Sequence, residues 1–249
     1  MINMKKPTLP LGLYIHVPFC RQKCRYCDFY SLPCREETMA EYTRAVTAHL
    51  TEIAPRATAH TVDTVYFGGG TPSYLGVKPL KAILSAIQKH YTLSRQAEIT
   101  LEANPDSAGD WKALRALRRA GFNRISIGMQ SAVEEELRAV GRIHTFSQVQ
   151  SAAEAARKAK LQNVSLDLIY GLPGQTPESF ETSLRAAVEL APEHISCYGL
   201  KLEEGTPLFA ARDTLILADD DAQADMYLFA VSFLQEHGYR QYEISNFAK

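Results

Sequence analysis

The sequence has no long apolar run and no excess of either charge. Its 249 residues hold 27 Lys and Arg against 28 Asp and Glu, a net charge of -1. It therefore lacks the basic balance typical of general nucleic-acid binders. No stretch is long and apolar enough to predict a membrane-spanning helix, and residues 1–10 lack the apolar segment of a signal peptide. We expect a globular, cytoplasmic chain.

Cysteine is scarce, with five residues in the chain, but its distribution is uneven. Four cysteines fall close together in the sequence: Cys20, Cys24, Cys27 and Cys34. A tight cluster in a chain without an export signal is typical of a metal or redox site in a reducing compartment. The spacing C-x3-C-x2-C suits an iron–sulfur cluster with one open iron. It also suits a structural zinc ion with His16 or Cys34 as the fourth ligand.

Strand and helix patterns alternate along most of the chain. Apolar stretches predict six strands, at residues 11–17, 62–67, 97–102, 124–128, 164–169 and 194–200. Helical spacing predicts helices after the first five, at residues 36–53, 79–90, 109–120, 133–160 and 177–190. This alternation predicts an α/β fold with a parallel sheet, either open or closed into a partial barrel.

The pattern changes after the sixth strand, where a loop leads to a helix near residues 220–237 and a last segment at 239–247. We therefore divide the chain into an N-terminal extension (1–10), a core (11–205) and a C-terminal region (206–249).

Polar and glycine-rich segments recur where the predicted strands end. The residues concerned are the cysteine loop, Gly68 to Pro72, Glu102, Gln130, Gly171 and Gly199. Asp167 lies inside an apolar strand, where a carboxylate needs a partner or a ligand. Because ligands bind at the carboxyl ends of parallel strands, we expect one site formed by all six strand ends.

The segment 20–27 (CRQKCRYC) resembles the signature of radical S-adenosylmethionine (SAM) proteins, with an aromatic residue before the last cysteine. Five other stretches are similar to the oxygen-independent coproporphyrinogen III oxidase family: 14–20 (YIHVPFC), 67–72 (FGGGTP), 102–105 (EANP), 126–131 (SIGMQS) and 167–175 (DLIYGLPGQ). The resemblance implies a partial (β/α)6 radical SAM barrel with a [4Fe–4S] cluster and SAM. In such proteins an electron from the cluster cleaves SAM to methionine and a 5′-deoxyadenosyl radical.

The resemblance also implies roles for individual residues. Cys20, Cys24 and Cys27 would hold the cluster. The residues matching SAM contacts are Tyr14, Gly69, Gly70, Thr71 and Glu102. Those matching the rest of the pocket, in part where the oxidases hold a second SAM, are Tyr26, Gln130, Arg142, Asp167 and Gly199.

One departure from the oxidases changes the expected function. The oxidases carry a further cysteine two residues after the third, where this sequence has Phe29. That is the pattern of the HemW-type haem chaperones, which bind haem as cargo and pass it to client proteins. The oxidase itself and a zinc-stabilised binding module are the alternatives.

The end of the sequence is a second departure. Members of the family continue past the segment that resembles residues 242–248 into a C-terminal domain with a His-Asn-x-x-Tyr-Trp element. We therefore expect this chain to be a fragment that lacks the C-terminal domain.

Overall fold

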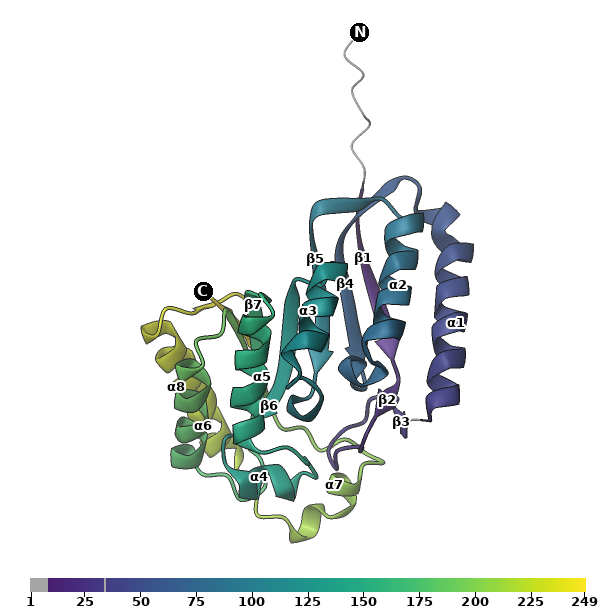
Figure 1. The fold of residues 1–249 in the computed structure, drawn as a ribbon. Coiled ribbons are helices and arrows are strands. Elements are labelled where there is room, and N and C mark those ends of the chain that lie inside the picture. The colour runs from purple at the N-terminus through teal and green to yellow at the C-terminus, as the bar shows by residue number, and fades with distance from the viewer. Residues whose placement is uncertain (1–8, 34) are drawn as a thin grey trace.

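The computed structural model describes residues 9–33 and 35–249. Cys34 and most of the expected N-terminal extension therefore lie outside the described residues. The main element is an eight-stranded sheet whose helices pack on one side (Figure 1). In spatial order its strands are β1 (Leu9–Val17), β4 (His60–Gly69), β5 (Leu93–Ala103), β6 (Arg124–Gln130), β7 (Asn163–Tyr170), β8 (His194–Gly199), β10 (Asn246–Ala248) and β9 (Arg240–Gln241).

The first six of these strands are parallel neighbours, as predicted. β10 pairs antiparallel with β8, and β9 pairs antiparallel with β10. β1 and β9 therefore stay at opposite edges of the sheet. The sheet is thus an incomplete barrel with an open side. Two short strands, β2 (Phe19–Cys20) and β3 (Leu32–Pro33), pair with each other at either end of the cysteine loop.

Most of the helices fall where the sequence predicts them. The helices are α1 (Glu36–Ile53), α2 (Val77–His90), α3 (Trp111–Ala120), α4 (Glu134–Ala139), α5 (Phe146–Lys158), α6 (Pro177–Glu189), α7 (Pro207–Ala210) and α8 (Asp220–Glu236). Helix α7 forms in the segment after the sixth strand that the sequence predicts as a loop. From the residue types alone, Thr176 is predicted to cap α6, with Pro177 at the first helical position. This is confirmed, because Thr176 accepts a hydrogen bond from the Ser179 backbone N–H (3.2 Å) and Pro177 begins the helix. Among the described residues, no helix has the length and apolar character that a bilayer crossing requires.

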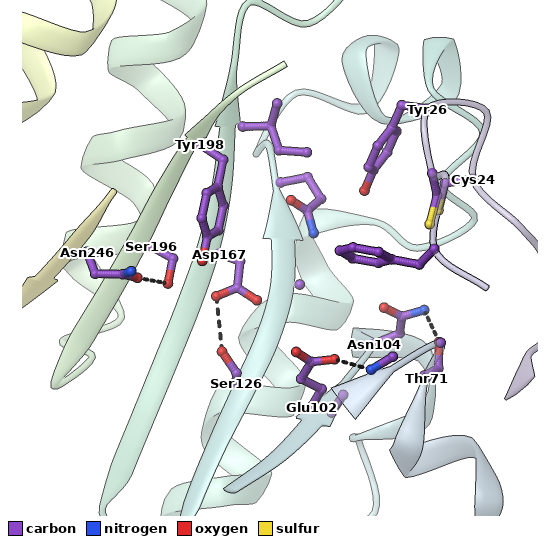
Figure 2. A pocket seen from close by; sticks show the side chains of 18 of the residues that line it. Cys24, Tyr26, Thr71, Glu102, Asn104, Ser126, Asp167, Ser196, Tyr198 and Asn246 are labelled. Carbon is purple, nitrogen blue, oxygen red and sulfur yellow. Dashed lines mark hydrogen bonds between the residues drawn. The ribbon is translucent and has the colours of Figure 1, made fainter. Parts of the chain in front are cut away.

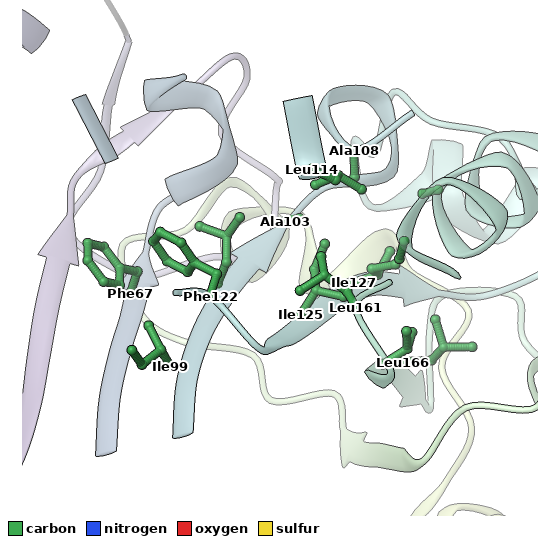
Figure 3. Close-up of a cluster of buried hydrophobic side chains, with 14 of the residues drawn as sticks. Phe67, Ile99, Ala103, Ala108, Leu114, Phe122, Ile125, Ile127, Leu161 and Leu166 are labelled. Atoms are coloured by element: carbon green, nitrogen blue, oxygen red, sulfur yellow. The ribbon is translucent and has the colours of Figure 1, made fainter. Parts of the chain in front are cut away.

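The core lies between the sheet and the helices (Figure 3). Ile125 and Ile127 of β6 are fully buried on this side, and Phe67 of β4 packs against Phe122 with ring centroids 5.0 Å apart. The mostly continuous apolar stretches are typical of strands that are buried on both faces. The other face of the sheet differs from this pattern, because side chains such as Ser126 line a cavity there. An incomplete barrel encloses space on its concave side, so that face can carry polar groups.

Candidate functional site

A cavity of about 1080 Å³ occupies the concave side of the sheet. Its lining includes residues at or near the carboxyl ends of the parallel strands, as expected for this architecture. Of the predicted site residues, those that line it are Cys20, Cys24, Tyr26, Cys27, Gly69, Gly70, Thr71, Glu102, Gln130, Arg142, Asp167 and Gly199. Figure 2 shows Cys24 and Tyr26 facing Glu102 and Asp167 across this space.

Tyr14 is the exception among the predicted residues. It is 58% exposed on β1 and does not line the cavity. Its ring stacks on Tyr66, and its hydroxyl lies 3.1 Å from Nδ1 of His16. Tyr14 therefore stands beside the cavity, one aromatic ring away from Glu102.

Contacts from distant parts of the chain fix the cysteine loop. The backbone N–H of Arg25 donates to the Val140 carbonyl (2.9 Å), and the Leu208 N–H donates to the Arg25 carbonyl (2.9 Å). The Arg25 guanidinium also donates to the Ala139 carbonyl (3.1 Å). Beneath the loop, Tyr26 packs on a small apolar cluster of Val140, Ile169, Leu172 and Leu208.

Each of the three thiols of the loop has a distinct environment. Thr71 donates from Oγ1 to Cys20 Sγ (3.5 Å), and Arg142 donates from Nη1 to Cys24 Sγ (3.4 Å). Burial raises the pKa of the Cys27 thiol. In the described part of the chain, no three His, Cys, Asp or Glu side chains are arranged to hold a metal ion. The thiolates of an iron–sulfur cluster bind separate irons, so a cluster does not require the three sulfurs to converge on one ion.

Arg142 connects the cysteine loop to the sheet. Its Nη2 donates to the Gly128 carbonyl (2.6 Å) and to Asn104 Oδ1 (3.2 Å), while its buried Nε has no partner. Burial acts to lower the pKa of Arg142, but the neighbouring Tyr26 and Cys24 raise it above its usual value. The side chain is thus a fixed cation with one buried N–H that has no hydrogen-bond partner.

Glycine is required at two positions at the end of β4, Gly69 and Gly70. At Gly70 a Cβ would lie 2.7 Å from the Phe19 carbonyl oxygen and 3.0 Å from Cys20 Sγ. Gly69 has a φ of 115°, a conformation that other residues rarely adopt, and its N–H donates to Glu102 Oε2 (3.1 Å). The segment therefore brings bare backbone close to the cysteine loop.

Two carboxylates face the cavity from neighbouring regions of the sheet. Glu102 accepts a hydrogen bond from the Tyr66 hydroxyl (2.7 Å), and Asp167 accepts one from Ser126 Oγ (3.0 Å). Burial raises the pKa of both carboxyl groups despite these bonds. The predicted need of Asp167 for a partner is met in part by Ser126.

Gln130 reaches the cavity through a strained turn. A bulge between Gly128 and Gln130 interrupts the pairing of β6 with β7, and Gln130 has a φ of 63°. The Ser131 N–H donates to the Met129 carbonyl (2.8 Å), which makes this a γ-turn. Such a conformation costs a non-glycine residue about 1–3 kcal/mol and is common at functional sites.

Sequence reasoning left some of the site's residues out. Asn104 donates to Thr71 Oγ1 (3.1 Å) and accepts from Arg142, so it joins the ends of β4 and β5 to Arg142. Ser196, Tyr198 and Asn246 complete the wall at β8 and β10. Asn104 stands within one of the stretches that carry the resemblance, whereas the contact of Asn246 with Ser196 depends on the antiparallel addition of β10.

Comparison with known proteins identifies the class. Residues 14–187 match the family profile of the Radical SAM superfamily. This chain belongs to the radical SAM superfamily, and membership implies a [4Fe–4S] cluster and SAM. The thiol loop, the bare glycine backbone beside it and the free Nε of Arg142 are compatible with these groups.

Within this superfamily, the chain is similar to haem chaperones and to a coproporphyrinogen III oxidase. The chain is 42% identical to the haem chaperone HemW of Escherichia coli over 96% of this chain and 63% of that protein. It is 37% identical to HemW of Bacillus subtilis, over 95% of this chain and 63% of the relative. The solved structure of the Escherichia coli coproporphyrinogen III oxidase HemN superposes with a TM-score of 0.88 at 30% identity, covering 99% of this chain and 57% of the oxidase. The chain thus spans less than two thirds of these relatives.

Proposed function

We propose that this chain is the cluster- and SAM-binding core of a haem chaperone, which holds haem as cargo and passes it to a client protein in the cytoplasm. The observation that carries the proposal is Phe29, which replaces the further cysteine of the oxidases. Its side chain is 63% exposed and lines the cavity, so no thiol is present there. The identity of 35–42% with haem chaperones over nearly the whole chain supports the same function.

Each group of cavity residues would bind a different part of the cofactors, according to its chemistry. Cys20, Cys24 and Cys27 would hold the cluster, which when bound supplies the electron for SAM cleavage. The Arg142 guanidinium, which lines the cavity, is suited to a carboxylate, and Glu102 to hydroxyl or ammonium groups. Gly69 and Gly70 let the ligand approach the backbone.

A second candidate function is decarboxylation of coproporphyrinogen III. The superposition on the oxidase structure favours it, because the two chains share the fold over 99% of this one. The two functions differ in whether the porphyrin is changed or only carried, so product analysis separates them.

The test uses full-length protein, purified and reconstituted without oxygen. Haem is titrated into it and followed by its Soret absorbance, and a parallel sample receives coproporphyrinogen III, SAM and a reductant. We expect stoichiometric haem binding and no decarboxylated product. Formation of protoporphyrinogen without haem binding would establish the oxidase instead. The Phe29→Cys variant shows whether this one residue separates the two outcomes.

A further inference from the structure

Glu136 of α4 is a buried carboxylate without a cation. Its residue is 3% exposed, and in the described part of the chain no ion pair reaches it. Three neutral side chains donate to it instead: Ser131 Oγ to Oε2 (2.6 Å), Gln175 Nε2 to Oε2 (2.9 Å) and Ser179 Oγ to Oε1 (2.5 Å). A buried carboxylate costs a great deal of free energy unless it is hydrogen-bonded, so this arrangement calls for an explanation.

The three donors come from three separate segments. Ser131 follows the end of β6, Gln175 lies in the loop between β7 and α6, and Ser179 lies in the first turn of α6. Ser183 extends the network, because its Oγ lies 3.1 Å from Ser131 Oγ and accepts from the Ala132 N–H (3.0 Å). Glu136 therefore joins the end of β6 to the start of α6.

The strained turn of Gln130 stands next to this junction. Ser131 N–H closes the γ-turn, and Ser131 Oγ both donates to Glu136 and accepts from the Val133 N–H (2.8 Å). A residue held at a φ of 63° needs such support from its surroundings. The turn directs Gln130 into the cavity, where its side chain lies near that of Arg142. A Cβ placed on Gly128 would lie 2.7 Å from Arg142 Nη2 and 2.8 Å from Gln130 Nε2, so both side chains approach the same point.

We propose that Glu136 is a positioning residue for the SAM pocket, acting through Ser131 on the turn that places Gln130. This inference rests on the proposed function, with SAM bound in the cavity that Gln130 lines. The role requires hydrogen-bond acceptors at Glu136 rather than a negative charge. A glutamine there can still accept from Ser131 and Gln175 and can donate to Ser179, whose hydroxyl has a second acceptor in the Thr176 carbonyl (3.1 Å).

The test is the affinity for SAM, measured by calorimetry on reconstituted full-length protein without oxygen. We expect Glu136→Ala to weaken SAM binding about tenfold or more, as loss of a supporting contact commonly does. Glu136→Gln should bind close to the unsubstituted protein. The matched control is Glu135→Ala, because Glu135 lies on the same helix but is exposed and pairs with Arg138.

A double-mutant cycle separates positioning from general stability. If Glu136 acts through Gln130, then Glu136→Ala should weaken SAM binding no further in a Gln130→Ala background. Ser131→Ala removes the same link with a smaller change, and it replaces Glu136→Ala in the cycle if that variant does not fold. In protein without cofactors, Glu136→Ala should also speed hydrogen exchange of the Ala132 and Val133 amides, while Gln130→Ala should not.

The outcomes that overturn the proposal differ from those that overturn the pocket. If Gln130→Ala weakens SAM binding but Glu136→Ala and Ser131→Ala do not, or if the losses add in the double variant, the positioning role is wrong and the pocket stands. If Gln130→Ala has no effect on SAM affinity, both the pocket assignment and the positioning role are wrong.

Discussion

Adjacent residues of β7 lie in two different environments, Leu166 among the helices and Asp167 on the side of the cavity. Leu166 is fully buried in the apolar core, whereas Asp167 is a carboxylate with a raised pKa that bonds Ser126. The same alternation holds on β6, where Ile127 faces the helices and Gln130 reaches the cavity. One face of the sheet therefore supplies stability, and the other accepts polar groups that do not favour folding by themselves.

The largest expected effect belongs to the cavity side. Cys24→Ala should abolish the iron content and brown colour of protein reconstituted without oxygen, because a thiolate ligand is lost. Cys197→Ala is the control, since Cys197 is buried in β8 away from the loop. Iron retained by Cys24→Ala, or lost equally in Cys197→Ala, would contradict the assignment of the three loop cysteines.

The core side should respond in stability rather than in cofactor content. Leu166→Ala should lower the free energy of unfolding by about 2–5 kcal/mol, because it leaves a cavity among packed side chains. Leu228→Ala, on the exposed side of α8, should change it by less than about 0.5 kcal/mol. Denaturant titration of the cofactor-free protein measures both. A loss of stability equal in the two variants would show that Leu166 is not part of the main core.

Two buried histidines should make stability depend on pH. Burial, with a nearby arginine, lowers the pKa of His144 and of His194 to about 4. In the unfolded chain they titrate near 6.5, so the unfolded state binds more protons between these values. The neutral histidines therefore contribute fully to the stability of the fold above about pH 6.5, and this contribution is lost as the pH falls toward about 4.

The measurement is the melting temperature between about pH 7.5 and 5. His194→Gln should flatten this dependence, whereas His49→Gln, exposed on α1, should leave it unchanged. An equal pH slope in the His194→Gln and unsubstituted proteins would show that burial does not suppress its protonation.

Among the cavity-lining residues, Asp167 should affect stability only slightly. Burial raises the pKa of its carboxyl, so the charged form is disfavoured in the fold, and Asp167→Asn should change the free energy of unfolding by about 1 kcal/mol or less. An asparagine oxygen can still accept from Ser126, while ligand affinity should fall if the carboxylate contacts SAM. A loss of unfolding free energy comparable to that of Leu166→Ala would show that the two faces of the sheet do not differ in their contribution to stability.

Most of the secondary structure could be predicted from the sequence, because periodicity and caps are local properties. The helix over 36–53 and the cap at Thr176 follow from nearest neighbours and are found as predicted. The apolar strand pattern did not reveal the polar face, since the strands of Ser126 and Asp167 each have only a few polar residues in a mostly apolar stretch. The roles of Asn104 and Glu136 were not predicted for a related reason. Apart from Ser131, which is near Glu136 in the sequence, their hydrogen-bond partners lie tens of residues away along the chain.

The sequence by itself determined the order of strands and helices, the thiol loop and the strand ends where polar groups gather. These depend on spacing and on residue type. Only the tertiary structure decided that Tyr14 stays beside the cavity, that Arg142 keeps one N–H free and that Glu136 holds a strained turn through neutral donors. The physical reason is that burial and hydrogen-bond geometry arise where distant segments meet, and a linear pattern does not encode those distances.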